Sequence, residues 1–263
     1  MLKGKEIKER LKRGDTVTSV MLRFDSPETA EMLALMGMDL IVIDNEHYPF
    51  DPETMIAIAR AAHAGGAACV VRLPRVDEAQ IKQVMDYGME GIWIPSVDSY
   101  EEAKALVESV KFAPVGKRGF CPITRAASYG VGMTPQEYAR LSNENSICVA
   151  QIETREGVED LDRILSIEEI DMISAGPSDL SASYGHPGEY DHPSVVQALQ
   201  TIEEKSKAAG KVTGGMYHDA EAVKRAYDQG VRYISFGSDQ QMLMNELKTL
   251  TAVTNAFREK KGQ

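Results

Sequence analysis

The chain has 263 residues and a mass of 28.9 kDa, with 43% hydrophobic and 26% charged residues. That mixture is ordinary for a soluble globular protein, and no stretch approaches the roughly 18 apolar residues of a membrane helix. The net charge of -11 disfavours binding to the phosphate backbones of nucleic acids and to anionic lipids. We therefore expect no nucleic-acid and no membrane partner.

The three cysteines, Cys69, Cys121 and Cys148, are odd in number and form no CxxC pair. They predict neither a disulfide framework nor a zinc knuckle, but small buried side chains in a reducing compartment. Residues 1–14 are rich in Lys, Glu and Arg and lack the apolar centre of a secretory signal. We expect a cytoplasmic protein.

Eight short apolar runs recur along the chain, and each is followed by a polar turn. Their hydrophobicity is continuous, as in residues 40–43 (LIVI), which is typical of strands buried on both faces of a parallel sheet. The runs are residues 16–22, 39–43, 68–73, 91–94, 146–152, 171–175, 211–216 and 232–236.

Helical patterns lie between these runs, at residues 52–64, 76–87, 99–111, 158–165, 194–209 and 220–229. Eight strand–helix units in a chain of this length predict a single-domain (β/α)8 TIM barrel over residues 1–263. A doubly wound sheet is the alternative architecture. The Gly-rich phosphate turn that usually follows its first strand is absent.

Two segments depart from the repeat. Residues 112–146 contain many glycines and prolines, and we expect a long excursion between the fourth helix and the fifth strand. A final amphipathic helix is predicted by apolar residues three and four positions apart, namely Leu243, Leu247, Leu250, Val253 and Phe257.

The polar residues at the carboxyl ends of the strands are the candidate site, because barrel enzymes carry their chemistry there. They are residues 44–47 (DNEH), Arg72, Glu153 and residues 176–179 (GPSD). Carboxylates without cysteine or additional histidine suit Mg²⁺ or Mn²⁺ better than zinc. The sequence therefore predicts a divalent-metal site at the barrel mouth.

A cation held by two carboxylates leaves positions at which the keto oxygen and carboxylate of a 2-oxo acid can chelate. Charge developing on that oxygen, as in an enolate, would be stabilised by the metal and by Arg72. His47, held in one tautomer by Asp44, is the expected acid–base group because histidine titrates near neutral pH. No lysine ends a strand run, since Lys211 begins one, which argues against a Schiff-base aldolase.

Five ordered motifs resemble those of the HpcH/HpaI family of class II pyruvate aldolases, from about residue 4 to residue 257. They are DNEH (44–47), VVRLP (70–74), GKRG (116–119), QIET (151–154) and GPSDLS (176–181). The resemblance implies a metal-dependent retro-aldol cleavage of a 4-hydroxy-2-oxo acid to pyruvate and an aldehyde, with Mg²⁺, Mn²⁺ or Co²⁺ as cofactor.

The resemblance also implies roles for individual residues. Glu153 and Asp179 would bind the metal, and Arg72 would steady the pyruvate enolate. His47 with Asp44 would move the proton of the aldol hydroxyl through a metal-bound water.

Further roles concern the substrate and the assembly. The backbone amides of Ser178 and Asp179 would hold the pyruvate carboxylate, as helix N-termini hold anions. Met216 would meet the aldehyde part of the substrate. Family members are commonly homohexamers, built as trimers of dimers that exchange the last helix.

Some details depart from the common family pattern and leave the substrate open. Residues 48–50 (YPF) replace a small residue and proline, and residues 214–218 (GGMYH) replace a more apolar run. His218 lies close enough to the mouth to contact substrate. Arg118 and Arg125 are either interface salt-bridge residues or contacts for a distal carboxylate of the substrate.

Each candidate also has a structural explanation when it is taken alone. Glu153 can be a solvated strand-end carboxylate, Asp179 a helix N-cap and Arg72 an ion-pair partner, whereas their joint placement favours a site. The rival functions are oxaloacetate decarboxylation, a CoA-thioester lyase related to the citrate lyase β-subunit, and a non-catalytic barrel with a binding or assembly role.

Overall fold

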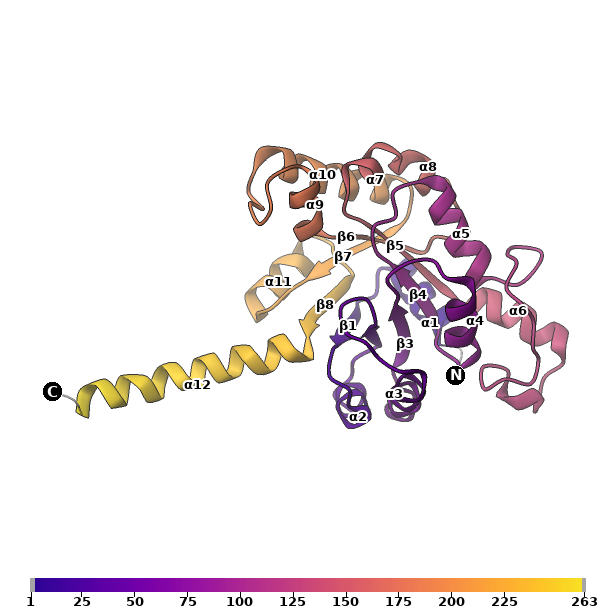
Figure 1. Cartoon of the computed structure of the whole chain (residues 1–263), viewed down its shortest axis with the longest axis horizontal. Coiled ribbons are helices and arrows are strands. Elements are labelled where there is room, and N and C mark those ends of the chain that lie inside the picture. Colours follow the sequence, from indigo (N-terminus) through magenta and orange to yellow (C-terminus); the bar gives the residue numbers. More distant parts are fainter. Residues whose placement is uncertain (1–2, 262–263) are drawn as a thin grey trace.

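The structure, a computed structural model, describes residues 3–261. Eight parallel strands close into a barrel in chain order and are surrounded by helices (Figure 1). This confirms the predicted TIM barrel and excludes the doubly wound sheet. The strands are β1 (Val17–Leu22), β2 (Leu40–Asp44), β3 (Ala68–Arg72), β4 (Gly91–Ile94), β5 (Ile147–Ile152), β6 (Met172–Ala175), β7 (Val212–Met216) and β8 (Tyr233–Ser238).

The continuous hydrophobicity of the strands follows from burial on both of their faces. In β2 the side chains of Ile41 and Ile43 join the layer between the sheet and the helices, whereas Leu40 and Val42 join the cluster inside the barrel. Alternation along a strand sends successive side chains to opposite faces, and here both faces are apolar.

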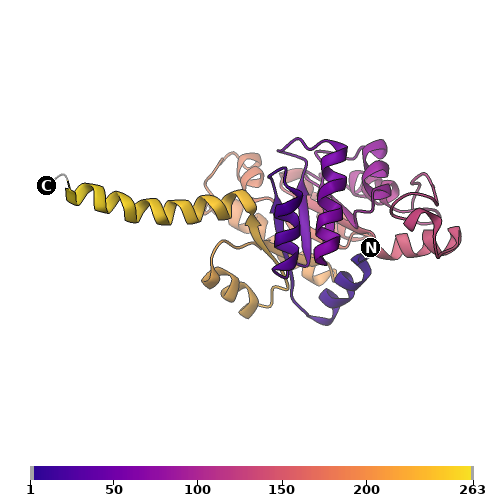
Figure 2. The same ribbon diagram turned by 90° about the horizontal axis from the view of Figure 1, so that it is seen from below.

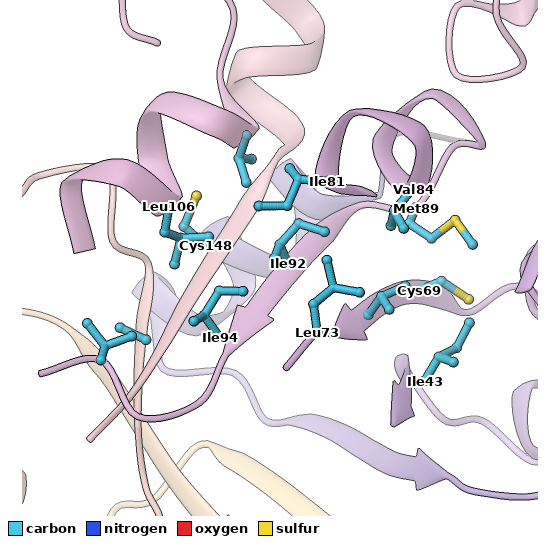
Figure 3. Packing of buried hydrophobic residues seen from close by; sticks show 14 of the residues in the cluster. Ile43, Cys69, Leu73, Ile81, Val84, Met89, Ile92, Ile94, Leu106 and Cys148 are labelled. Atoms are coloured by element: carbon cyan, nitrogen blue, oxygen red, sulfur yellow. The ribbon is translucent and has the colours of Figure 1, made fainter. Parts of the chain in front are cut away.

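The outer layer is continuous from the strands to the helices that cover them (Figure 3). Ile92 of β4 and Leu106 of the following helix are fully buried in it. Cys69 and Cys148 lie in the same layer as free thiols, as predicted for small buried side chains. Burial raises the pKa of the Cys148 thiol to about 12.

Most helices begin with a side-chain cap. Asp51 caps α3 by accepting from Thr54 N, and Asp77 caps α4 by accepting from Gln80 N. Within residues 3–261, no helix has both the length and the apolar character needed to cross a bilayer. The helices before the excursion are α1 (Gly4–Arg13), α2 (Pro27–Leu35), α3 (Pro52–Gly65), α4 (Glu78–Asp86) and α5 (Tyr100–Val110).

The excursion predicted for residues 112–146 packs beside the barrel and has structure of its own. It contains a short 3-10 turn (Ser128–Gly130) and α6 (Pro135–Asn145). A separate small cluster, formed by Phe112, Ala126, Ala127 and Tyr138, stabilises it. The remaining helices are α7 (Arg155–Glu159), α8 (Leu161–Leu165), α9 (Pro177–Ser183), α10 (Pro193–Ala208), α11 (Ala220–Asp228) and α12 (Asp239–Lys261).

The last helix, α12, projects away from the barrel instead of packing along it (Figures 1 and 2). The apolar stripe predicted from the sequence therefore has no cover from the part of the chain that the structure describes. Leu247 and Leu250 are 47% and 53% exposed. Beside it, a groove of about 620 Å³ opens between α11 and the outer faces of β1 and β8, lined in part by Ile234, Phe236 and Tyr227.

Candidate active site

A cavity of about 650 Å³ opens at the carboxyl ends of the strands, within the size range of small-molecule sites. Its lining includes six of the seven side chains predicted for the site. These are His47, Arg72, Glu153, Ser178, Asp179 and Met216. Asp44, the seventh, is fully buried and contacts the cavity only through its two partners, Arg72 and Arg23.

The Glu153 carboxylate is held in one orientation at the end of β5. Its Oε1 accepts hydrogen bonds of 2.8 Å from both N and Oγ of Ser96, and its Oε2 accepts one from Gln151 Nε2. Gln151 is fixed in turn by Trp93, whose Nε1 donates to its Oε1 at 2.7 Å. Glu153 is thus a buried, pre-oriented carboxylate on the cavity wall.

Gly176 gives the Glu153 carboxylate its space. A Cβ at position 176 would overlap Glu153 Oε2, so any other residue would displace this carboxylate. Pro177 then begins α9 and places Asp179 in the first turn, on the same cavity. The exposed Asp179 carboxylate has no hydrogen-bond or ion-pair partner in the described part of the chain.

The chemistry of these donors suits a hard divalent cation. Both are carboxylates, one oriented and one unpartnered, and both line one cavity. Across residues 3–261, no group of three or more His, Cys, Asp or Glu side chains is placed to hold a metal. A cation held by Glu153 and Asp179 would take its other ligands from water or substrate, as Mg²⁺ commonly does.

Arg72 is fixed by the register of the sheet. Asp44 and Arg72 are directly paired residues of β2 and β3, and Arg72 Nε and Nη2 donate to Asp44 Oδ1 at 3.1 and 2.8 Å. The other oxygen, Oδ2, accepts from Arg23 Nε at 3.1 Å. Two guanidinium groups therefore compensate the negative charge of the buried Asp44. A buried ion needs such a partner, because burial removes its hydration.

The predicted contact between Asp44 and His47 is wrong, because the two guanidinium groups occupy Asp44. The nearest carboxylate to the largely exposed His47 is that of Glu46, with 3.6 Å between His47 Nε2 and Glu46 Oε1. Burial raises the pKa of Glu46, whereas Arg72 and His47 oppose that rise. The roles of His47 and Asp44 in proton transfer stay predictions.

The excursion arginines do not line the cavity. Arg118 is buried over the Phe112 ring, and its Nη2 donates to Ser142 Oγ at 2.6 Å. Arg125 Nη1 donates to the carbonyl of Tyr87 at 2.6 Å. Within this chain both arginines stabilise the packing of the excursion. His218 does line the cavity, as considered from the sequence.

Sequence reasoning missed several residues of the site, among them Arg23, Ser96, Gln151 and Tyr190. Two of them had a signal in the sequence. Gln151 precedes Glu153 by two positions, which places both on one face of the strand. Arg23 directly follows the first apolar run, where the strand-end rule applies. Ser96 and Tyr190 lie in loops, and they reach the site only through the path of the folded loop, which the sequence pattern does not show.

Comparisons with family models and with known proteins all point to one family. A family model described as HpcH/HpaI aldolase/citrate lyase matches residues 19–246. The 5-keto-4-deoxy-D-glucarate aldolase of Enterobacter sp. (strain 638) is 37% identical over 214 residues, which cover 81% of this chain and 82% of that protein.

Two solved structures are also similar to the chain. An HpcH/HpaI aldolase/citrate lyase family protein from Burkholderia cenocepacia J2315 has a TM-score of 0.87 at 28% identity, covering 95% of this chain and 99% of that one. The citrate synthase SbnG has a TM-score of 0.85 at 30% identity, covering 96% and 98%.

Proposed function

The chain belongs to the HpcH/HpaI aldolase/citrate lyase family, and from that premise we propose that it cleaves a 4-hydroxy-2-oxo acid to pyruvate and an aldehyde with the help of a divalent metal. The observation that carries this proposal is the pair of carboxylates, Glu153 and Asp179, on one cavity with the Arg72 guanidinium. The aldolase names of the relatives support a carbon–carbon lyase.

Glu153 and Asp179 would hold the metal, which when bound supplies a Lewis acid for the keto oxygen of the substrate. Arg72 lies on the cavity wall with its plane fixed by Asp44, so its positive charge is preorganised for the enolate oxygen. The backbone N–H groups of Ser178 and Asp179 have no backbone acceptor among the described residues and would bind the substrate carboxylate.

Cleavage breaks the bond between C3 and C4. His47 takes the proton of the 4-hydroxyl group, whose oxygen becomes the carbonyl of the aldehyde. The electron pair of the broken bond passes to C3 and gives the enolate of pyruvate, which Arg72 stabilises. The proton that His47 took up is then returned to C3, which releases pyruvate and restores His47. Met216, 44% exposed on the wall, would contact the aldehyde part.

Pyruvate release from metal-stripped protein tests the proposal. The protein is incubated with oxaloacetate and with several 4-hydroxy-2-oxo acids, and Mg²⁺, Mn²⁺ or Co²⁺ is then restored. We expect metal-dependent pyruvate release from hydroxy acids. Release from oxaloacetate alone would replace the aldolase by a decarboxylase, and no release from any substrate would favour a binding role.

We also propose that the protein is a homo-oligomer in which α12 of one copy packs on the barrel of another. The uncovered stripe of α12 and the groove beside β1 and β8 are both apolar, and the groove lies where an eighth barrel helix would pack. A twofold exchange makes both contacts at once, since each copy gives and receives a helix. Three such dimers would form the hexamer.

The buried thiols of Cys69 and Cys148 support a cytoplasmic location.

A further inference from the structure

Ser96, in the loop after β4, directs both of its hydrogen-bond donors at one oxygen of the Glu153 carboxylate. Its N and its Oγ donate to Glu153 Oε1, each at 2.8 Å. Ser96 does not belong to the residues that line the cavity. It therefore acts on the cavity through Glu153.

The backbone of Ser96 has a conformation that serine rarely adopts. Its φ is 46°, in the left-handed region that is costly for an L-residue and that glycine enters freely. Ser96 is exposed, so packing of its own side chain does not explain this conformation. Its neighbours Pro95 and Val97 are buried, and Val97 N donates to the carbonyl of Gln151 at 3.0 Å. Strained residues held in this way cluster at functional sites.

The donors around Glu153 leave one acceptor position open. A carboxylate has about four lone-pair sites, shared equally by its two oxygens. Ser96 occupies both sites of Oε1, and Gln151 Nε2 occupies one site of Oε2. The remaining site is on Oε2, the oxygen that lies against Gly176, from which the chain leads to Asp179. Glu153 therefore offers a cation one oxygen.

The negative charge of Glu153 has no counter-ion from the protein. Glu153 is 1% exposed, and among the side chains of residues 3–261 no Lys, Arg or His forms an ion pair with it. Arg72, on the same cavity, pairs with Asp44 and Glu46 instead. A buried charge needs compensation, and a cation at the open site of Oε2 would supply it.

We propose that Ser96 is a positioning residue that makes Glu153 a donor of one oxygen and thereby disfavours Ca²⁺ relative to Mg²⁺. Ca²⁺ takes about six to eight oxygen ligands and accepts both oxygens of a carboxylate, whereas Mg²⁺ requires near-octahedral geometry with fewer ligands. The inference rests on the proposed metal-dependent function and adds the control of its metal selectivity.

The test measures the affinities for Mg²⁺ and Ca²⁺ by competition with Mn²⁺ on the metal-free protein, followed by electron paramagnetic resonance. Ser96→Ala and Ser96→Gly free one lone-pair site of Oε1. Both should raise the affinity for Ca²⁺ relative to Mg²⁺ by about tenfold over the wild type, the size of one hydrogen bond to a charged group. Ser96→Gly also removes the cost of the positive φ, so it serves if Ser96→Ala does not fold.

Ser99→Ala is the matched control. Ser99 lies in the same loop and caps α5 by accepting from Glu102 N at 3.3 Å, without a hydrogen bond to Glu153. Its loss should leave the relative affinity for Ca²⁺ and Mg²⁺ unchanged. Melting curves establish that each variant is folded.

Infrared spectra report the coordination of Glu153 directly. The two carboxylate stretching bands lie further apart when one oxygen binds a cation than when both do. Difference spectra between Ca²⁺-loaded and metal-free protein should show the larger separation in the wild type and the smaller one in Ser96→Ala and Ser96→Gly. Loss of these bands in Glu153→Gln assigns them to Glu153.

An unchanged relative affinity in both Ser96 variants would overturn the assignment, as would an equal shift in Ser99→Ala or the smaller band separation in the wild type. If the wild type releases no pyruvate from any hydroxy acid but its metal preference depends on Ser96, the aldolase proposal fails and the role of Ser96 stands. If the wild type binds none of the three cations, the metal site fails and this inference fails with it.

Discussion

The Glu153 carboxylate owes its position to a residue without a side chain. Gly176 begins the turn before α9, and any Cβ there would overlap Glu153 Oε2. The proposed metal site thus depends on close approach of backbone and carboxylate at the ends of β5 and β6. A backbone position of this kind supplies no ligand and still determines where a ligand lies.

Gly176→Ala should lower kcat on the order of a hundredfold, because displacing a ligating carboxylate by about 1 Å has effects of that size. Steady-state pyruvate release measures it. Gly119→Ala is the matched control, since a Cβ there meets only the flexible end of the Lys82 side chain. Equal activities of the two variants would contradict the role assigned to position 176.

Arg72→Ala should lower kcat by on the order of a hundredfold or more if Arg72 stabilises the enolate. The variant should also unfold more easily by about 3 kcal/mol, because the buried Asp44 keeps only one of its two guanidinium partners. Turnover assays and denaturant titration measure the two effects. Near-normal turnover would remove Arg72 from the mechanism.

Sequence reasoning located most of this site but not its pairings. Strand-end position was enough to select Arg72, Glu153 and Asp179. The partner of Asp44 depends on sheet register, which pairs it with Arg72 of β3, and no local spacing encodes that register. The three-residue separation of Asp44 and His47 suggested a contact. However, β2 ends at Asp44, whose side chain is buried in the barrel wall, whereas His47 lies in the turn that follows.

At the scale of elements, strands were predicted more completely than helices. All eight apolar runs are strands, because burial on both faces leaves a strong continuous pattern. The helix α2 was missed because Met32, Leu33 and Leu35 are apolar on different sides of it, so no stripe is visible. α6 was missed because the segment before it, residues 112–135, is interrupted by glycines and prolines.

The capping box of α6 should stabilise the excursion. Thr134 Oγ1 accepts from Glu137 N at 3.2 Å, and Glu137 Oε2 accepts from Thr134 N at 2.8 Å. Thr134→Ala should cost about 1 kcal/mol in the free energy of unfolding. Urea denaturation measures it, with Thr201→Ala inside α10 as the control. Equal costs for the two variants would show that the cap has no special effect.

At the scale of the molecule, α12 is the element least explained by one chain. Its apolar stripe is exposed, and only Ala226 of the neighbouring α11 is buried. Both features are explained when a second copy fills the groove. The start of α12 also holds the backbone that follows β1, because the Asp239 carboxylate accepts from N of Arg23 and N of Phe24.

Leu247→Glu should dissociate the proposed oligomer, because it would place a charge in the proposed apolar contact between copies. Lys248→Glu changes the charge on the opposite face of the same helix and should leave the assembly intact. Light scattering with size-exclusion chromatography gives the masses. A Leu247→Glu protein with the wild-type mass would contradict the exchange of α12.

The central claim is that Glu153 and Asp179 together hold one divalent cation at the barrel mouth. Its most direct test is titration of the metal-free protein with Mn²⁺, followed by electron paramagnetic resonance, in the wild type, Glu153→Gln, Asp179→Asn and the control Asp191→Asn. We predict one bound Mn²⁺ per chain in the wild type and the control, and at least tenfold weaker binding in the other two variants. Undiminished Mn²⁺ binding by Glu153→Gln and Asp179→Asn would contradict the account.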